Sequence, residues 1–291
     1  MLNFLKLFLF IFIGQKLVYS FSFPLNSLIK STGKLNMIPQ DNIQYFYNFQ
    51  DSLLINGIGY SFLKDSSQKS LTKNGLVHSS ILGVGLWTLL GFQAYLFCVS
   101  YLILGSIVTK IGIEEKEKLG IAEKREGMRG PENVWGSAGV AMICAMLTFI
   151  YSENPEVINL LKIGYASSLV TKLSDTFQSE IGKVYGKTTL LITTLEPVPK
   201  GTEGAISLEG YCAGIVGSII LSVIAYFLNI ISYPNDIAIC TISSILATTS
   251  ESFIGATSQN KINWLNNELV NFINTFIGCM LAISIYSILN Y

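Results

Sequence analysis

Two carboxylates lie in a polar stretch between hydrophobic segments, a setting in which charged side chains need a partner or a function. Asp175 and Glu180 belong to the run KLSDTFQSEIG at residues 172–182. An unpaired charge near the centre of a bilayer costs about 3 kcal/mol or more, so intramembrane acids mark candidate sites. At helical spacing Asp175 shares a face with Gln178 and Ser179, and also with Thr171, whereas Glu180 points away from it.

The two acids therefore have different expected roles. Magnesium prefers one or two carboxylates together with phosphate oxygens and water, so Asp175 alone is a sufficient protein ligand. Glu180 would then be a second ligand, or would pair with Lys183 or Lys187 and orient that base. Ordinary salt bridging at a membrane surface explains the same residues equally well.

Two arginines precede a hydrophobic segment in a glycine-rich turn. Arg125 and Arg129 flank Gly127 and Gly130, and the segment begins near Asn133. Arginine forks and free backbone amides at a helix N-terminus are suited to phosphate, so this group is a candidate nucleotide and substrate site. A simple anchor at the membrane surface fits the pattern equally well.

A second glycine-rich turn follows the acidic block. Lys200, Gly201, Thr202 and Gly204 precede another hydrophobic segment, and their backbone amides and lysine form a possible phosphate cradle. The spacing is not that of a Walker motif, so the turn alone is weak support for nucleotide binding.

Composition defines the class of protein that must position these side chains. Half of the 291 residues are apolar and 13% are charged, which indicates an integral membrane protein. The 19 basic and 19 acidic residues cancel, so the net charge gives no indication of nucleic-acid binding. His78 is the only histidine, which argues against a histidine-rich metal site or a histidine-based catalytic triad.

Hydropathy predicts an all-α, polytopic transmembrane helix bundle with about seven or eight membrane segments in residues 41–291. Several segments are shorter than the ~20 residues that a perpendicular helix needs, which favours tilted or re-entrant elements. The eight candidate segments cover residues 43–63, 76–91, 93–109, 133–151, 157–173, 211–231, 236–255 and 266–289.

The connections divide into loops that carry basic residues and short turns that carry none. Loops 64–75, 109–132, 172–209 and 254–268 together hold 14 of the 19 basic residues. If each segment spans once, these loops all lie on one face, and the positive-inside bias places that face in the compartment from which insertion occurs. In loop 109–132 six bases are matched by six glutamates, so residues 114–118 are predicted to be a solvated helical face.

The first 40 residues have the composition of a bipartite targeting leader. Residues 1–20 contain a lysine followed by an apolar core of signal-peptide length, and residues 21–40 contain bases and hydroxyls but no acid. Such a leader is similar to those of proteins bound for a complex plastid, in which the charged loops would face the stroma. The alternatives are an ordinary secretory signal peptide or an uncleaved first membrane helix.

Polar residues recur in the C-terminal segments. Asn263, Asn267, Asn271 and Asn274 follow one another at helical spacing and predict a polar stripe on one helix face. Unsatisfied amides are costly in hydrocarbon, so the stripe must face protein or water. Pairing between helices explains it without any substrate.

Four ordered blocks of the chain form a recognisable signature: KREGMRGPENVWGSA (124–138), LSDTFQSEIG (173–182), ITT with VPKGT (192–194 and 198–202) and ESFIGAT (251–257). Together they resemble the signature of one integral membrane family. That family contains the plastid phytyl-phosphate kinases of tocopherol (vitamin E) synthesis, an isoprenoid-dependent pathway, together with uncharacterised bacterial, archaeal and animal relatives. In the second block, Phe177 and Gln178 depart from the smaller residues that are common in the family.

The resemblance implies a phytyl-phosphate kinase that transfers a phosphoryl group from a nucleoside triphosphate, with CTP favoured, to phytyl phosphate. The expected cofactor is Mg²⁺, bound by Asp175. Phosphates of the nucleotide and substrate would be bound by Arg125, Arg129, Asn133, Lys183, Lys200, Gly201, Thr202 and Gly204.

Two other functions are consistent with the same residues. One is another polyprenol or lipid kinase, and the other is a membrane transporter or scramblase whose polar groups line a pathway. The grouping of basic residues and glycine turns on one face favours a kinase, because a pathway would place polar groups at several depths. Neither the oligomeric state nor the prenyl acceptor follows from the sequence.

Overall fold

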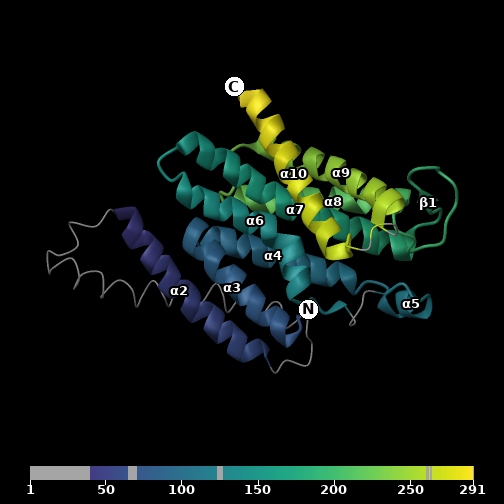
Figure 1. The fold of residues 1–291 in the computed structure, drawn as a ribbon, viewed down its shortest axis with the longest axis horizontal. Helices are drawn as coiled ribbons and strands as arrows, with labels where there is room; N and C mark the ends of the chain where they lie inside the picture. The colour runs from purple at the N-terminus through teal and green to yellow at the C-terminus, as the bar shows by residue number, and fades with distance from the viewer. Residues whose placement is uncertain (1–39, 65–70, 123–126, 260–261, 263, 291) are drawn as a thin grey trace.

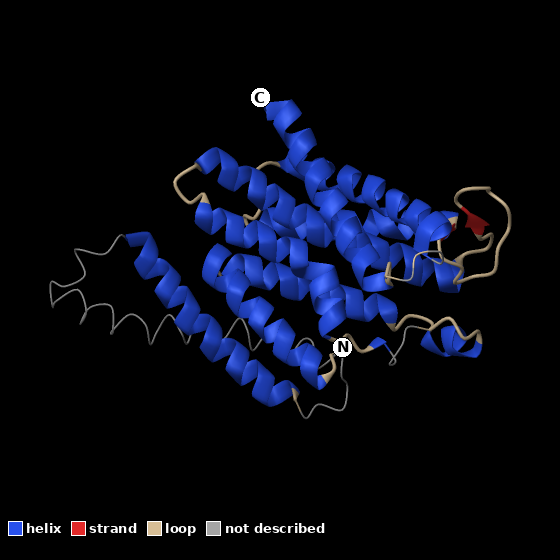
Figure 2. Ribbon diagram, in the orientation of Figure 1, coloured by secondary structure: helices blue, strands red, loops and turns tan. Residues whose placement is uncertain are grey.

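The computed structural model describes residues 40–64, 71–122, 127–259, 262 and 264–290 of the chain. The predicted targeting leader lies outside these residues, apart from Gln40, at which the first described helix begins. Nearly all of the regular structure is helical (Figures 1 and 2). The elements are α2 (Gln40–Leu63), α3 (Lys73–Leu90), α4 (Phe92–Thr109), α5 (Ile113–Lys118), α6 (Pro131–Ile150), α7 (Pro155–Tyr185), β1 (Leu190–Leu191), β2 (Ala205–Ile206), α8 (Leu208–Phe227), α9 (Pro234–Ile254), the π-helical turn η3 (Gly255–Gln259) and α10 (Asn267–Asn290).

The protein is an all-α, polytopic membrane protein, as predicted. Each of the eight predicted segments coincides with one of the long helices: α2, α3, α4, α6, α7, α8, α9 and α10. Five helices of the described part of the chain are long and apolar enough to cross a membrane: α4, α6, α8, α9 together with η3, and α10.

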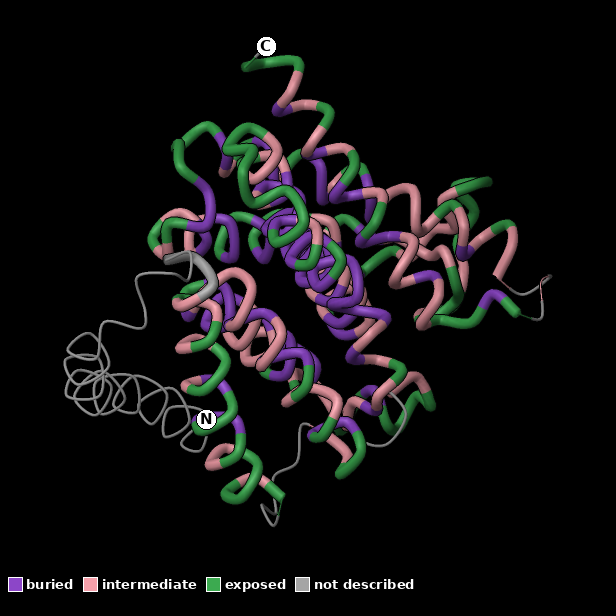
Figure 3. Tube along the Cα trace, turned by 60° about the vertical axis from the view of Figure 1, so that its left-hand side comes forward, coloured by how far each residue is buried: buried purple, intermediate pink, exposed green. Residues whose placement is uncertain are grey.

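Helix α7 is the centre of the bundle. It packs against α4, α6, α8, α9 and α10, and buried residues concentrate on these central helices (Figure 3). Small and hydroxyl-bearing residues let the backbones approach closely, as is usual between membrane helices. Ser174 donates to the Gly214 carbonyl of α8 at 3.0 Å, and Ser167 donates to the Gly278 carbonyl of α10 at 2.9 Å. The central helix α7 is therefore also the helix that carries Asp175.

The predicted loop 172–209 was wrong over its first part, because α7 continues through the acidic block to Tyr185. A helix of 31 residues is about 46 Å long at 1.5 Å per residue, whereas the hydrocarbon core of a bilayer is about 30 Å thick. Helix α7 is therefore long enough to pass through that core and extend beyond it, although it is not among the five helices that are also apolar enough to cross. Asp175 and Glu180 occupy rigid helical positions rather than a flexible connection.

The charged connections gather at one end of the bundle. Helix α5, the β1–β2 hairpin and the turn from η3 into α10 lie at the same end, whereas the short turns 151–154 and 228–233 lie at the other (Figure 1). Residues 114–118 form the predicted helical face in α5, but Lys116 is 1% exposed and contradicts the prediction of a wholly solvated face. Its buried partner, Glu180, is 64 residues further along the chain.

Candidate functional site

A polar cavity of about 780 Å³ opens at the end of the bundle that carries the charged connections. It lies between α6, α7, α9, η3, α10 and the loop that joins α7 to α8. Eight charged side chains of the described residues line this polar cavity, and their formal charges cancel. The bases are Arg129, Lys172, Lys183 and Lys200, and the acids are Asp175, Glu203, Glu251 and Glu268.

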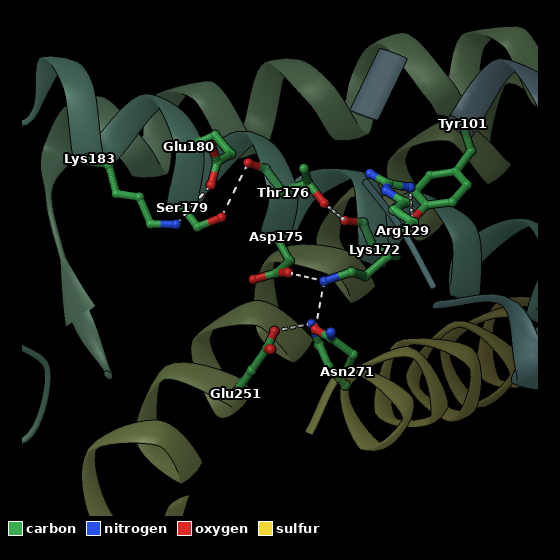
Figure 4. Close-up of polar contacts among 11 residues, drawn as sticks. Tyr101, Arg129, Lys172, Asp175, Thr176, Ser179, Glu180, Lys183, Glu251 and Asn271 are labelled. Carbon is green, nitrogen blue, oxygen red and sulfur yellow. Dashed lines mark hydrogen bonds and ion pairs between the residues drawn. The ribbon is translucent and has the colours of Figure 1, made fainter. Parts of the chain in front are cut away.

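Lys172 and Asp175 form the innermost polar cluster. The Lys172 ammonium donates to Asp175 Oδ2 at 2.5 Å and to Asn271 Oδ1 of α10 at 2.6 Å (Figure 4). Glu251 of α9 accepts a hydrogen bond from Asn274 and interacts electrostatically with Asp175 and Lys172. Three helices thus place two carboxylates and one ammonium around a single point, and the Asp175 side chain stays 21% exposed to the polar cavity.

Arg129 is held at the wall of the polar cavity by its backbone and by its guanidinium. Its carbonyl accepts from the Thr72 amide at 3.0 Å, and Nη1 donates to the Tyr101 hydroxyl at 3.0 Å. The guanidinium also lies 5.4 Å from the centre of the Tyr101 ring, a cation–π contact. Gly105 makes room for this side chain, because a Cβ there would lie 2.7 Å from Nη2. The arginine is therefore oriented before any ligand binds.

The glycine-rich turn forms another wall. Gly201 has φ +85° and Gly204 has φ +75°, which side chains with a Cβ rarely adopt. A Cβ at Gly204 would lie 2.5 Å from the Ala256 amide nitrogen of η3, so glycine also permits the turn to pack against that element. The Lys200 ammonium donates to the Val184 carbonyl at the end of α7, at 2.9 Å. This contact ties the turn to the helix that carries Asp175.

Glu180 lies behind the polar cavity and is completely buried. It accepts from Lys116 Nζ at 2.5 Å and from Lys183 Nζ at 2.8 Å. The pairing of Glu180 with Lys183 agrees with one of the two partners suggested by the sequence. Since Lys183 lines the polar cavity and Glu180 does not, this geometry suits a residue that orients a base.

Glu203 is the acid of the turn itself. Partial desolvation in the cavity wall raises the pKa of its carboxyl above the ordinary value, Lys183 opposes this shift, and the negative charge of Asp175 adds to it. Glu203 therefore binds a proton more readily in the folded protein than in an unfolded chain.

The predicted site residues mostly come together. Eight of the ten line the polar cavity: Asp175, Arg129, Asn133, Lys183, Lys200, Gly201, Thr202 and Gly204. Glu180 is set behind it, and Arg125 lies outside the described residues. Sequence reasoning assigned no role to Lys172, Glu203 or Glu251. The spacing of Lys172 three residues before Asp175, and the place of Glu251 in an apolar segment, were available signals.

The polar faces predicted on α7 and α10 divide between the polar cavity and the protein interior. Gln178 and Ser179 line the cavity with Asp175, whereas Thr171 is fully buried and packs against Gly278. In the asparagine stripe, Asn267 and Asn271 line the cavity, Asn274 pairs with Glu251, and Asn263 lies outside the described residues. Helix pairing therefore accounts for part of the stripe, as the sequence suggested.

The fold and the cavity define a polytopic helical membrane protein with a charged, glycine-walled cavity at one end. The chain belongs to the DUF92 family of integral membrane proteins, whose model matches residues 58–279. No solved structure matches the chain.

Three curated relatives are similar over 73% to 80% of the chain. Over 235 residues the chain is 49% identical to the uncharacterized membrane protein sll0875 of Synechocystis, covering 80% of this chain and 90% of that one. Over 215 residues it is 42% identical to Protein VTE6, chloroplastic, of Arabidopsis thaliana, covering 73% of this chain and 64% of that one. The uncharacterized membrane protein MJ0933 of Methanocaldococcus jannaschii is 34% identical over 220 residues, which cover 75% of this chain and 87% of that one.

Proposed function

We propose that this protein is a prenyl-phosphate kinase, which transfers a phosphoryl group from a nucleoside triphosphate to a prenyl monophosphate and forms the diphosphate. The observation that carries the proposal is the polar cavity at one end of the bundle, where Arg129, Lys183, Lys200 and the turn 201–204 line the same cavity as Asp175. Phosphoryl transfer requires chiefly positioning and charge neutralisation; these groups can position the phosphates and supply part of the neutralising charge. The resemblance of the four sequence blocks to phytyl-phosphate kinases favours phytyl phosphate as the acceptor and CTP as the donor.

The substrate has two parts, and the location of the cavity suits both. A prenyl phosphate has an apolar tail that belongs in the bilayer and an anionic head that belongs at its surface. A cavity at the end of a helix bundle lets a membrane-bound acceptor meet a water-soluble nucleotide. Arg129 would bind the acceptor phosphate, while Lys200 and the amides of the turn 201–204 would bind the nucleotide phosphates.

Magnesium fits the residues that are present. The four basic and four acidic side chains lining the described part of the cavity leave no net positive charge for a triphosphate. Added divalent charge would supply it, and Asp175 and Glu251 provide the hard oxygen ligands that Mg²⁺ prefers. When bound, the ion would neutralise charge on the phosphates. The described residues hold no cluster of three or more His, Cys, Asp or Glu for a metal, so substrate phosphates and water would have to complete the coordination of the ion.

No side chain needs to act as a general base in this reaction. The acceptor oxygen belongs to a phosphate monoester, whose second pKa is about 6, so it is already anionic near neutral pH. Lys172 would instead orient Asp175, through the 2.5 Å contact between Nζ and Oδ2. Glu180 would orient Lys183 from behind the cavity wall.

The test is a phosphoryl-transfer assay with purified protein in detergent. Labelled CTP or ATP is supplied with Mg²⁺ and with phytyl phosphate or phytol. Labelled phytyl diphosphate, with no transfer to phytol, supports the proposal. Transfer to neither, by protein that remains folded, refutes it and favours a transport function, which ion or lipid flux in liposomes would then measure.

We also propose a plastid membrane as the location, with the charged end of the bundle facing the stroma. The composition of residues 1–40 supports this, as does similarity to a protein whose name describes it as chloroplastic. A fluorescent fusion to residues 1–40 should be imported into the plastid. Retention in the secretory pathway would refute the assignment.

A further inference from the structure

A second, apolar pocket adjoins the polar cavity and shares part of its wall. The apolar pocket has a volume of about 110 Å³ and lies between α2, α3, α4 and α6. Arg129, Asn133 and Ser137 line both the apolar pocket and the polar cavity. Most of its other lining is hydrocarbon, from Leu63, Leu71, Leu76, Leu82, Val99, Leu102, Val134 and Ala138.

The shared residue Arg129 determines what kind of molecule would fit. A guanidinium at the mouth of a hydrocarbon pocket suits an anionic head joined to an apolar chain. Its orientation is set by Tyr101, which also lines the apolar pocket. A phosphate on Arg129 would therefore have the polar cavity on one side and the apolar pocket on the other.

The volume limits how much of a chain can enter. An apolar cavity of about 150 Å³ in another protein holds one benzene molecule, so 110 Å³ accommodates about one five-carbon isoprene unit. A C20 prenyl chain has four such units. The others would lie against the outer apolar surface, where Phe49, Leu53 and Phe62 of α2 and Ile81 of α3 are exposed.

Resting on the proposed function, we infer that the apolar pocket binds the isoprene unit next to the phosphate of the acceptor, and that the rest of the chain stays in the bilayer. The site would then select acceptors by the structure of the first isoprene unit, and not by the length or saturation of the rest of the chain. Phytyl and geranylgeranyl phosphates have the same first unit and differ beyond it. Outer units exchange one hydrocarbon environment for another and add little affinity.

The chain offers a matched pair of positions for testing this inference. Gly59 lines the apolar pocket and Gly57 does not, yet a Cβ at either position would meet nothing within 4 Å. Both are interior to α2, where leucine is a better helix former than glycine. Gly59→Leu adds four carbons at the pocket wall, about the size of the isoprene unit, whereas Gly57→Leu adds them outside it.

The first experiment measures binding without requiring phosphoryl transfer. Geranyl monophosphate with a photoreactive diazirine on its first isoprene unit is irradiated with the purified protein, and the labelled peptides are identified by mass spectrometry. The inference predicts labelling of α3, α4 or α6 around Leu82, Val99 and Val134, lost in Gly59→Leu and retained in Gly57→Leu. Labelling elsewhere, or labelling unaffected by Gly59→Leu, would overturn it.

The second experiment separates the inference from the proposed function. In mixed micelles the KM values for phytyl and geranylgeranyl phosphates, expressed as mole fractions, should agree within about threefold. Gly59→Leu should raise both by about tenfold or more and leave the nucleotide KM unchanged. Labelling of the pocket without phosphoryl transfer would refute the kinase activity and support isoprene binding in the apolar pocket. Phosphoryl transfer with a strong preference between the two acceptors would support the kinase activity and refute the proposed role of the apolar pocket.

Discussion

Replacing Glu180 by glutamine should act mainly on the stability of the fold, and should affect turnover only through the orientation of Lys183. The carboxylate is fully buried between Lys116, which is 1% exposed, and Lys183, whose side chain is 22% exposed. Glutamine keeps the shape of the side chain but removes its charge. The Lys116 ammonium would then be buried without an opposite charge, because its described partners would be the neutral Thr109 carbonyl, 2.6 Å away, and the amide oxygen of the glutamine.

The size of the effect follows from the burial of that pair. Removing one partner of a buried ion pair typically costs about 3–5 kcal/mol, because the other charge stays buried without compensation. A domain of about 250 residues loses roughly 2–4 °C of melting temperature per kcal/mol. Glu180→Gln should therefore melt roughly 6–20 °C below the wild type.

The assay is thermal unfolding in detergent, followed by intrinsic fluorescence and paired with turnover measured well below the melting temperature. Lys183→Met is the matched control for melting, because loss of this more exposed lysine should destabilise the fold less than loss of the charge that pairs with Lys116. A double replacement, Lys116→Met with Glu180→Leu, should recover much of the stability, since an apolar pair can replace a buried ion pair. Unchanged melting together with abolished turnover in Glu180→Gln would contradict the reasoning and make Glu180 a catalytic residue.

Three further variants probe the walls of the polar cavity. Gly105→Ala should displace Arg129 and raise the acceptor KM roughly tenfold to a hundredfold, which is the loss expected for a hydrogen bond to a charged group. The control Gly57→Ala should leave the acceptor KM unchanged. Equal acceptor KM values in the two variants would refute the role of Arg129. Lys200→Met should raise the nucleotide KM and spare the acceptor KM; the reverse pattern would reassign this base. Because the folded pKa of Glu203 is raised, the contribution of this carboxyl to stability is present near pH 4 and is lost as the pH rises through that pKa. Glu203→Gln should therefore melt at a higher temperature than wild type only at higher pH. A difference in melting temperature that does not change with pH would refute the shift.

The helices were largely predictable from hydropathy, because long apolar runs have few alternatives in a membrane. The exception was α7, whose polar second half was interpreted as a loop. That interpretation overlooked a signal: residues 165–181 contain neither glycine nor proline, so nothing local ends the helix before Gly182. The turn after α7 and the glycines within it were placed correctly.

Residues of the candidate site could be proposed from the sequence where chemistry and spacing coincide, but not where their placement depends on packing. Arg129, Asp175 and the turn 201–204 stand out by residue type and neighbours. Lys116 was predicted to be solvated, because its own helix is polar on most faces and its partner is 64 residues away. Glu251 reaches the cluster only because α9 and α10 pack against α7, a tertiary arrangement that one sequence does not specify.

The most direct test of the central claim compares wild-type protein with Asp175→Asn in the transfer of label from a nucleoside triphosphate to phytyl phosphate. Asparagine preserves the shape of this partly exposed side chain, so the variant should remain folded and inserted. We predict Mg²⁺-dependent formation of phytyl diphosphate by the wild type and none by the variant. Wild-type turnover in Asp175→Asn would remove Asp175 from the site, and absence of transfer by the folded wild type would contradict the kinase itself.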